Sequence, residues 1–259
     1  MQTDCLIIAS RFRGPPRSGN GGYVCGQLAA HVRGIAAVRL KAPPPLETEL
    51  RVERADAAAR LLHGAVIIAE ARPATLDIEV PTAPSFIEAA EAAKSYLGFR
   101  EHSFPGCFVC GPQRAEAGGL RIFAEPVALQ SLASALSLPA SPGPSTSPGL
   151  VAAPWIPDHS LADDAGLVRR EFLWSALDCP GAFALLPVPE GKAVVLGELY
   201  ARINGSIVPG EPCVAAGWLL RSEGRKRMVG TAIYDGSGRA VAVARAIWLE
   251  VEAGAFGGQ

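Results

Sequence analysis

The chain has 259 residues, of which 49% are hydrophobic, so it can build one large or two modest packed cores, and disorder throughout is excluded. Its 24 basic and 25 acidic residues give a formal net charge of −1. This balance excludes an overall positive field that would attract nucleic acid or an anionic membrane. An anionic ligand would have to be bound by local groups.

The apolar run near the start of the chain predicts a strand. The run is about half the length that a membrane-spanning helix needs, and Asp4 stands where a signal peptide carries positive charge. We therefore expect a cytoplasmic protein with no membrane partner. The cysteines are scattered along the chain, whereas a small secreted domain has a dense set of them. We therefore expect reduced thiols. They are Cys5, Cys25, Cys107, Cys110, Cys179 and Cys213.

The first part of the chain predicts one helix followed by several strands. Residues 5–10 are apolar and strand-like, glycine-rich residues 14–22 interrupt them, and residues 23–34 have helical length and small side chains. Short segments rich in Val, Ile and Leu then predict antiparallel strands, which we place at 36–42, 49–55, within 58–74 and at 77–80. This order indicates an α+β fold.

The middle of the chain predicts a connection. Residues 84–99 begin with Pro84 and Ser85 ahead of Ala- and Glu-rich sequence, which favours a helix. Residues 119–127 predict another strand. Residues 128–149 are rich in Pro, Ser and Gly and cannot bury enough apolar surface to order themselves, so we expect a mobile insertion in a hairpin.

The first pattern then returns. A strand is predicted at 150–158 and a helix at 171–186, followed by strands at 193–203, 213–223, 226–235 and 240–252. Residues 36–54 also align loosely with 197–223, because each places a proline-containing corner before a strand. The repeated order indicates an internal duplication.

Three stretches resemble the thioesterase members of the hotdog fold family. They are SGNGGYVCGQLA at 18–29, FPGCFVCGPQ at 104–113 with GLRIF after it, and SALDCPGAFAL at 175–185. The resemblance covers most of the chain. It implies an α+β protein of two tandem hotdog folds, each a long central helix wrapped by a curved antiparallel sheet. The N-terminal half would span 1–98, a connector with the CxxC turn, a strand and the Pro/Ser-rich insertion would span 99–149, and the C-terminal half would span 150–259.

The resemblance also implies an acyl-CoA thioesterase-like hydrolase, with coenzyme A as part of the substrate, no cofactor and no metal. In such proteins the site commonly lies between two paired units, one giving a helix N-terminus and the other a carboxylate. Gly21 and Gly22 begin the first helix, where free N–H groups suit an oxyanion. Asp178 in the second half is the candidate base or nucleophile. We therefore expect one composite site, and the outer sheet edges leave room for a homodimer.

Four further residues are candidates for binding the substrate. Asn20 can hydrogen-bond the substrate, although asparagine is also a favoured helix N-cap, which is the interpretation that we prefer. Tyr23 follows the glycine pair. Arg13 and Arg17 precede the helix and suit the phosphates of coenzyme A, because arginine binds phosphate through two parallel hydrogen bonds.

Cys107 and Cys110 have the spacing of a zinc half-site, and His102 is near them in the sequence. A structural zinc needs four ligands, and the sequence has no second CxxC. One of the other cysteines would have to complete the site through space. We therefore expect a knuckle-like turn without metal.

Other interpretations stay open. Asp178 can be a helix-interior acid with a structural partner, and the glycines can form a simple tight turn. A protein that binds acyl thioesters without turnover is one alternative function. A hydratase of enoyl thioesters is another, but it would need a histidine beside Asp178, and none is close in the sequence. The absence of a G-x-S-x-G motif excludes the nucleophile-elbow class of serine hydrolases.

Overall fold

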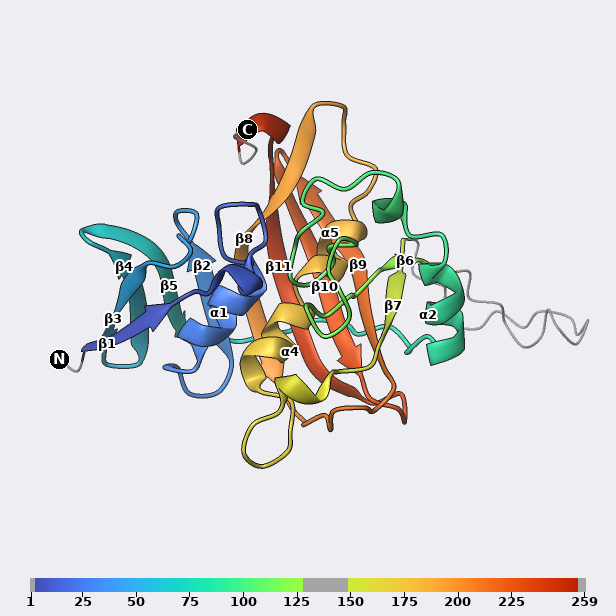
Figure 1. Cartoon of the computed structure of the whole chain (residues 1–259), viewed down its shortest axis with the longest axis horizontal. Helices are drawn as coiled ribbons and strands as arrows, with labels where there is room; N and C mark the ends of the chain where they lie inside the picture. Colours follow the sequence, from blue (N-terminus) through green and yellow to red (C-terminus); the bar gives the residue numbers. More distant parts are fainter. Residues whose placement is uncertain (1–2, 128–148, 256–259) are drawn as a thin grey trace, which may run out of the picture.

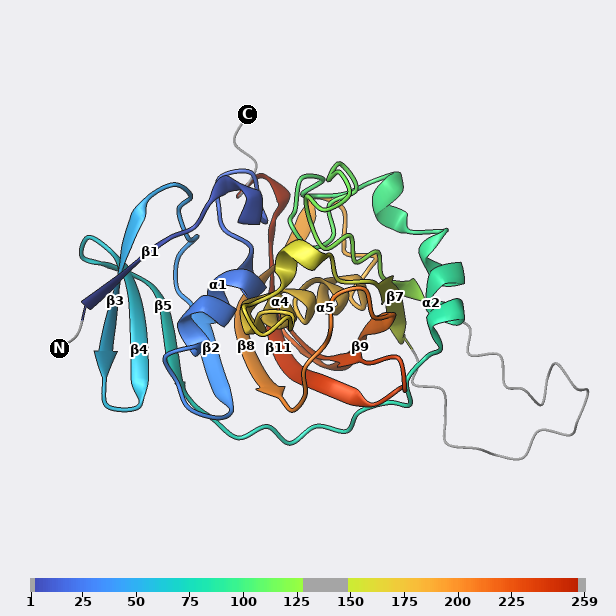
Figure 2. The ribbon, with the colours of Figure 1, turned by 60° about the horizontal axis from the view of Figure 1, so that its bottom comes forward.

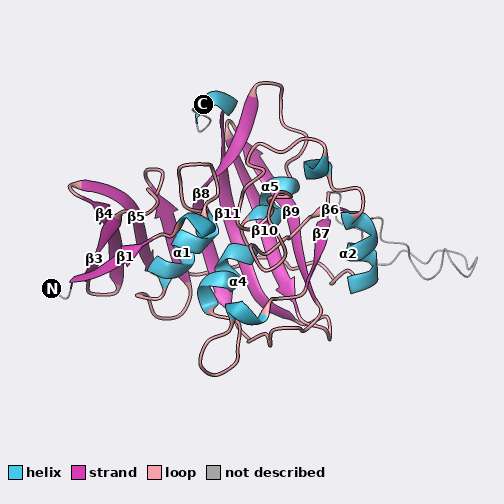
Figure 3. Ribbon diagram, viewed as in Figure 1, coloured by secondary structure: helices cyan, strands magenta, loops and turns pink. Residues whose placement is uncertain are grey.

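A computed structural model describes residues 3–127 and 149–255, in which one large antiparallel sheet carries a small number of helices (Figure 1). The sheet has eleven strands in the order β1-β3-β4-β5-β2-β8-β11-β10-β9-β7-β6. Helices α1, α4 and α5 lie on one of its faces (Figures 1 and 3). The predicted α+β class is confirmed.

The first part of the chain contains β1 (Thr3–Ile7), α1 (Gly21–Ala29), β2 (Ala36–Leu40), β3 (Glu49–Ala55), β4 (Ala58–His63) and β5 (Val66–Pro73). The middle contains α2 (Phe86–Ala93) and β6 (Glu125–Pro126). The last part contains β7 (Val151–Trp155), α4 (Arg170–Ala176), α5 (Cys179–Phe183), β8 (Lys192–Ile203), β9 (Cys213–Glu223), β10 (Lys226–Tyr234) and β11 (Ala240–Glu252). Short 3-10 helices span Ser10–Phe12, Leu97–Phe99, His159–Leu161 and Ala253–Ala255.

The strand order is mirrored about the pairing of β2 with β8. Reading outward from this pair, β2, β5, β4, β3 and β1 follow on one side, and β8, β11, β10, β9 and β7 follow on the other. The central pair is antiparallel, with Ala36 opposite Ala201 and Arg39 opposite Glu198. Because the sheet is continuous across this junction, the helices of both parts of the chain share one face.

Two apolar layers cover the two faces of the sheet. On the helical face, Leu28, Phe172 and Leu199 are at most 1% exposed and belong to the main core cluster. On the other face, the connection between β5 and α2 runs along the sheet (Figure 2). Leu76 of this connection packs in a second cluster with Trp218. No helix within the described ranges, 3–127 and 149–255, is long and apolar enough to cross a membrane.

Two predicted strands are wrong. Residues 77–80 belong to the connection rather than to the sheet, and Ile78 and Val80 pack on the second cluster instead of pairing. Residues 119–124 are also irregular, so only Glu125–Pro126 form a strand there. Arg121 has a φ of 54°, a left-handed conformation that an extended strand does not contain. The predicted mobile insertion at 128–149 lies outside the described residues except for Gly149.

The long central helix predicted in the second half is also wrong, because the chain forms two short helices, α4 and α5. Asp178 lies at the break, with φ −79° and ψ −77°, rather than inside a helix. Pro180 explains the interruption, since its ring would clash with the carbonyl four residues earlier in a continuous helix. The buried hydroxyl of Thr231 donates to the Leu177 carbonyl at 2.8 Å. It replaces the helical hydrogen bond that a backbone carbonyl loses at the end of a helix.

The predicted connecting helix is confirmed in its start and is shorter than expected. Ser85 is its N-cap, and a capping box links Ser85 and Glu88.

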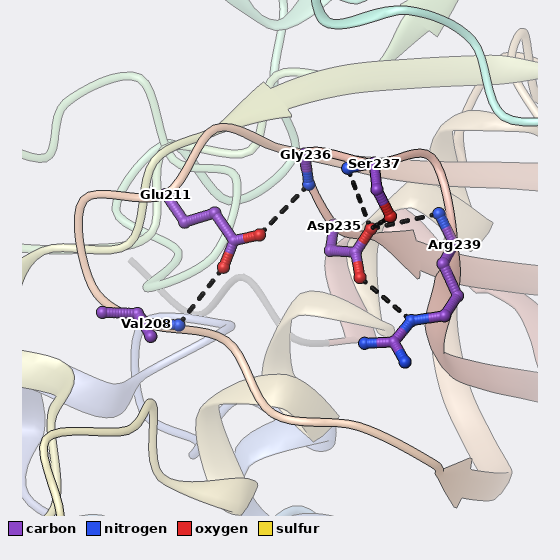
Figure 4. A network of polar contacts seen from close by, with 6 residues as sticks. All are labelled: Val208, Glu211, Asp235, Gly236, Ser237 and Arg239. Atoms are coloured by element: carbon purple, nitrogen blue, oxygen red, sulfur yellow. Dashed lines mark hydrogen bonds and ion pairs between the residues drawn. The ribbon is translucent and has the colours of Figure 1, made fainter.

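Two loops at one end of the second part are held by carboxylates (Figure 4). Glu211 accepts from the N–H of Gly236 at 3.2 Å. Asp235 accepts from the N–H groups of Ser237 and Arg239 at 3.0 and 3.1 Å, which closes the turn between β10 and β11.

Candidate active site

A cavity of about 470 Å³ is lined by residues of the first part of the chain, of the segment 97–110 and of the last part. The start of α1 contributes Asn20 and Gly21 to its wall, and residues 97–110 contribute His102, Cys107 and Cys110. The second part contributes Asp178 and Cys179 between α4 and α5, together with the apolar edge of β8. The cavity therefore joins polar groups from both halves to an apolar space.

Asp178 is the buried carboxylate among the described lining residues, with only 2% of the residue exposed, whereas Glu101 and Glu190 also line the cavity but are not buried. Its Oδ2 accepts a hydrogen bond from the Gly22 N–H at 2.9 Å and another from Asn20 Nδ2 at 2.8 Å. Its Oδ1 is buried and has no protein partner within the described residues. The carboxylate of one half is thus held by the helix start of the other half, 156 residues away in sequence.

The close approach of α1 and α4 requires glycine. A Cβ on Gly22 would lie 2.6 Å from the Asp178 Cβ and 2.7 Å from the Trp174 carbonyl oxygen. One turn further along α1, a Cβ on Gly26 would lie 2.7 Å from the Glu171 Cα. Contacts this short do not occur without movement of the backbone. Glycine at both positions therefore lets the Gly22 N–H reach the carboxylate.

Asn20 has two roles in the structure. Its Oδ1 accepts from the Tyr23 N–H at 2.9 Å, so the predicted N-cap of α1 is confirmed. Its Nδ2 donates to Asp178, so the same side chain also orients the carboxylate. The contact with Asp178 has no local signal in the sequence, because the two residues are 158 positions apart.

Burial raises the pKa of Asp178 from its ordinary value of 3.8 to about 7. The Gly22 N–H acts in the opposite direction because it stabilises the ionised form, whereas nearby Cys107 raises the pKa further and Asn20 lowers it. Both protonation states of Asp178 are therefore accessible near neutral pH.

The two glycines differ in what their N–H groups offer. The Gly22 N–H is already bonded to Asp178. The Gly21 N–H donates no hydrogen bond to any described residue, and Gly21 lines the cavity. An unpaired N–H at the first position of a helix is the kind of group that binds an anionic oxygen.

The remaining sequence candidates lie outside the cavity wall. Tyr23 is buried in the core, where its ring stacks on Phe12 with centroids 4.1 Å apart. Arg13 donates to the Gly106 carbonyl at 3.3 Å, and Arg17 is exposed. The cations of the wall are instead Lys41 and Lys192. Neither lysine belongs to a sequence motif, so neither was predicted.

The thiols of Cys107, Cys110 and Cys179 gather at the same cavity, and their Sγ atoms all lie within 4.8 Å of one another. Hydrogen bonds with the thiols of Cys110 and Cys179 lower the pKa of Cys107. All six cysteines of the chain are free thiols, as expected.

Comparison with solved structures shows that this fold also occurs in proteins described as thioesterases. No protein-family model and no curated protein sequence matches the chain. An acyl-CoA thioesterase II, TesB2, from Mycobacterium marinum has 12% identity and a TM-score of 0.61, covering 96% of this chain and 93% of that chain. The TesB protein of Mycobacterium avium subsp. paratuberculosis has 12% identity and a TM-score of 0.58, with the same coverage. The resemblance predicted from the sequence is confirmed for the fold.

Proposed function

We propose that the protein is an acyl-CoA thioesterase built from two tandem hotdog halves, residues 1–98 and 150–259, joined by residues 99–149. The observation that carries this proposal is the pairing of Asp178, from the second half, with the helix start at Gly22, from the first half. A thioesterase needs a carboxylate and an oxyanion donor at one point, and each half supplies one of them.

The proposed reaction begins when an acyl-CoA places its thioester carbonyl near the start of α1. In one route, Asp178 acts as a general base and removes a proton from the water that attacks the carbonyl carbon. In the other route, the Asp178 carboxylate itself attacks this carbon as the nucleophile. The free Gly21 N–H stabilises the oxyanion of the tetrahedral intermediate. In the general-base route, the protonated Asp178 returns its proton to the departing thiolate when the C–S bond breaks, and coenzyme A and the free acid leave. In the nucleophilic route, the thiolate of coenzyme A leaves and takes a proton from solvent, and water then hydrolyses the anhydride between the acyl group and Asp178.

The substrate would be held at two ends. The apolar part of the cavity, which includes Leu196 and Trp248, suits the acyl group. Lys41 and Lys192 stand at the wall as cations for the coenzyme A phosphates, although Glu70 and Glu252 pair with them in the absence of substrate. Exposed Arg17 is a further candidate for these phosphates.

The test is thiol release from a panel of acyl-CoAs that differ in chain length and aromatic character. Asp178→Asn is the informative variant, because an asparagine oxygen can still accept from Gly22 and Asn20 while the base is lost. Turnover should fall at least about 100-fold, the order expected for removal of a general base. Exposed Asp164 gives the matched control, and Asp164→Asn should keep full activity.

Two outcomes would contradict the proposal. If no acyl-CoA releases thiol but acyl-CoA raises the melting temperature, the protein binds acyl thioesters without turnover. If an enoyl-CoA is hydrated instead, the cavity works as a hydratase. The structure gives this second candidate one specific basis, since His102 lines the same cavity as Asp178.

A further inference from the structure

Three thiols meet at the cavity wall although they come from distant parts of the chain. Cys107 and Cys110 lie between α2 and β6, and Cys179 begins α5. The Sγ atoms of Cys107 and Cys179 are 3.8 Å apart. This distance is much longer than a disulfide bond of about 2.0 Å. It equals the edge, about 3.8 Å, of a tetrahedron of thiolates around an ion with Zn–S bonds of about 2.3 Å.

The surroundings of Cys107 favour a sulfur that carries negative charge. Its Sγ lies within 4.8 Å of the Sγ atoms of Cys110, in the same C-x-x-C turn, and of Cys179. Asn20 Nδ2 lies 3.9 Å from the same sulfur. Hydrogen-bond donors directed at a thiolate stabilise it and orient it as a ligand. The turn is therefore arranged as half of a metal site.

Unpartnered polar atoms lie at the same cavity. Asp178 Oδ1 and His102 Nε2 are both buried and have no hydrogen-bond partner within the described residues. Both residues line the cavity together with the three cysteines. Buried polar atoms without partners are uncommon in proteins. Because His102 Nδ1 accepts from the Phe104 N–H, its Nε2 is a donor, and water bound to an ion would supply a partner for Nε2 and for Asp178 Oδ1.

We propose that Cys107, Cys110 and Cys179 bind one Zn²⁺ ion as three thiolates, with the fourth coordination position facing the cavity. Each thiol releases its proton to solvent when it coordinates the ion. Thiolate ligands select a thiophilic ion over Mg²⁺ or Ca²⁺, and three protein ligands leave one position for water or for a ligand from the cavity. Cys179 thus adds a third ligand to the half-site that the CxxC spacing indicates. This proposal does not depend on thioesterase activity.

The test uses the full chain, fully reduced and freed of metal with a chelator. Titration with Co²⁺ under anaerobic conditions should show one ion per chain and a thiolate-to-metal charge-transfer band, and Zn²⁺ should displace the Co²⁺. Cys107→Ala and Cys179→Ala should each abolish stoichiometric binding. Cys213→Ala removes a buried thiol outside the cluster and should leave binding unchanged.

Several results would overturn the proposal. They are the absence of stoichiometric binding in the reduced wild type, its persistence in both cluster variants, and its dependence on exposed Cys5. Formation of a Cys107–Cys179 disulfide, with no ion bound after reduction, would identify a redox pair instead.

A second measurement on the wild type covers variants that fail to fold. Zn²⁺ should slow alkylation of the three cluster cysteines, mapped by mass spectrometry, and leave Cys5 unaffected. Equal alkylation rates with and without Zn²⁺ would contradict the site. Thiol release measured on the same samples separates the two proposals, because ion binding without turnover would refute only the proposed function.

Discussion

Replacement of Gly22 by alanine tests whether the contact between the two halves is catalytic. The added Cβ would lie 2.6 and 2.7 Å from atoms of Asp178 and Trp174. Since an optimal carbon contact is about 3.5–4.0 Å, α1 and α4 must separate by roughly 1 Å. The Gly22 N–H to Asp178 distance, now 2.9 Å, would then exceed hydrogen-bonding range. A displacement of this size in an active site costs about 100-fold in rate, which we expect in kcat for thiol release.

Gly26→Ala is the matched control, because it introduces an equally short contact against α4, 2.7 Å from the Glu171 Cα, one turn further from Asp178. Both variants should lose about 1–3 kcal/mol of unfolding free energy in urea denaturation, the usual cost of overpacking. Only Gly22→Ala should lose most of its kcat. Full activity in Gly22→Ala, or equal losses of activity in the two variants, would refute the assignment of this contact to the catalytic site.

Three further predictions concern stability. Thr231→Val should cost about 1–3 kcal/mol in urea denaturation, because the buried Leu177 carbonyl loses its 2.8 Å hydrogen bond, and an unchanged midpoint would contradict this role. Ser85→Ala should cost about 1 kcal/mol and speed amide exchange in α2, since it removes the capping box; unchanged exchange would show that packing alone holds the helix. Burial acts to raise the pKa of Asp235, but its hydrogen bonds with Ser237 and Arg239 outweigh burial and leave the pKa below 3.8. When folding lowers the pKa of a carboxyl group, the ionised group adds stability at pH values above its unfolded-state pKa. This stability is lost as the pH falls through the folded-state pKa. The advantage of wild type over Asp235→Asn in thermal unfolding should therefore shrink from pH 7 to pH 3, and a constant difference would contradict the ionised network.

Much of the fold could be predicted from the sequence because its signals are local. Strands 49–55 and 213–223 have the predicted bounds, since alternation of apolar residues and flanking Pro and Gly are read within a few residues. The repeated order of elements predicted the internal duplication, and the strand order is mirrored about the β2–β8 pair. Local signals failed at 119–124, which are irregular with Arg121 in a left-handed conformation, and at the predicted second helix, which Pro180 interrupts.

The sequence alone determined the chemistry that each half carries: a glycine-rich helix start in the first, Asp178 in the second, and a C-x-x-C turn between them. Only the tertiary structure decided which groups meet. Asn20 and Asp178 are 158 positions apart, and Cys107 and Cys179 are 72 apart. Such contacts arise because β2 and β8 pair across the centre of one sheet and place the helices of both halves on the same face. Periodicity and turn chemistry act over a few residues, whereas this meeting of distant groups depends on how the whole chain packs.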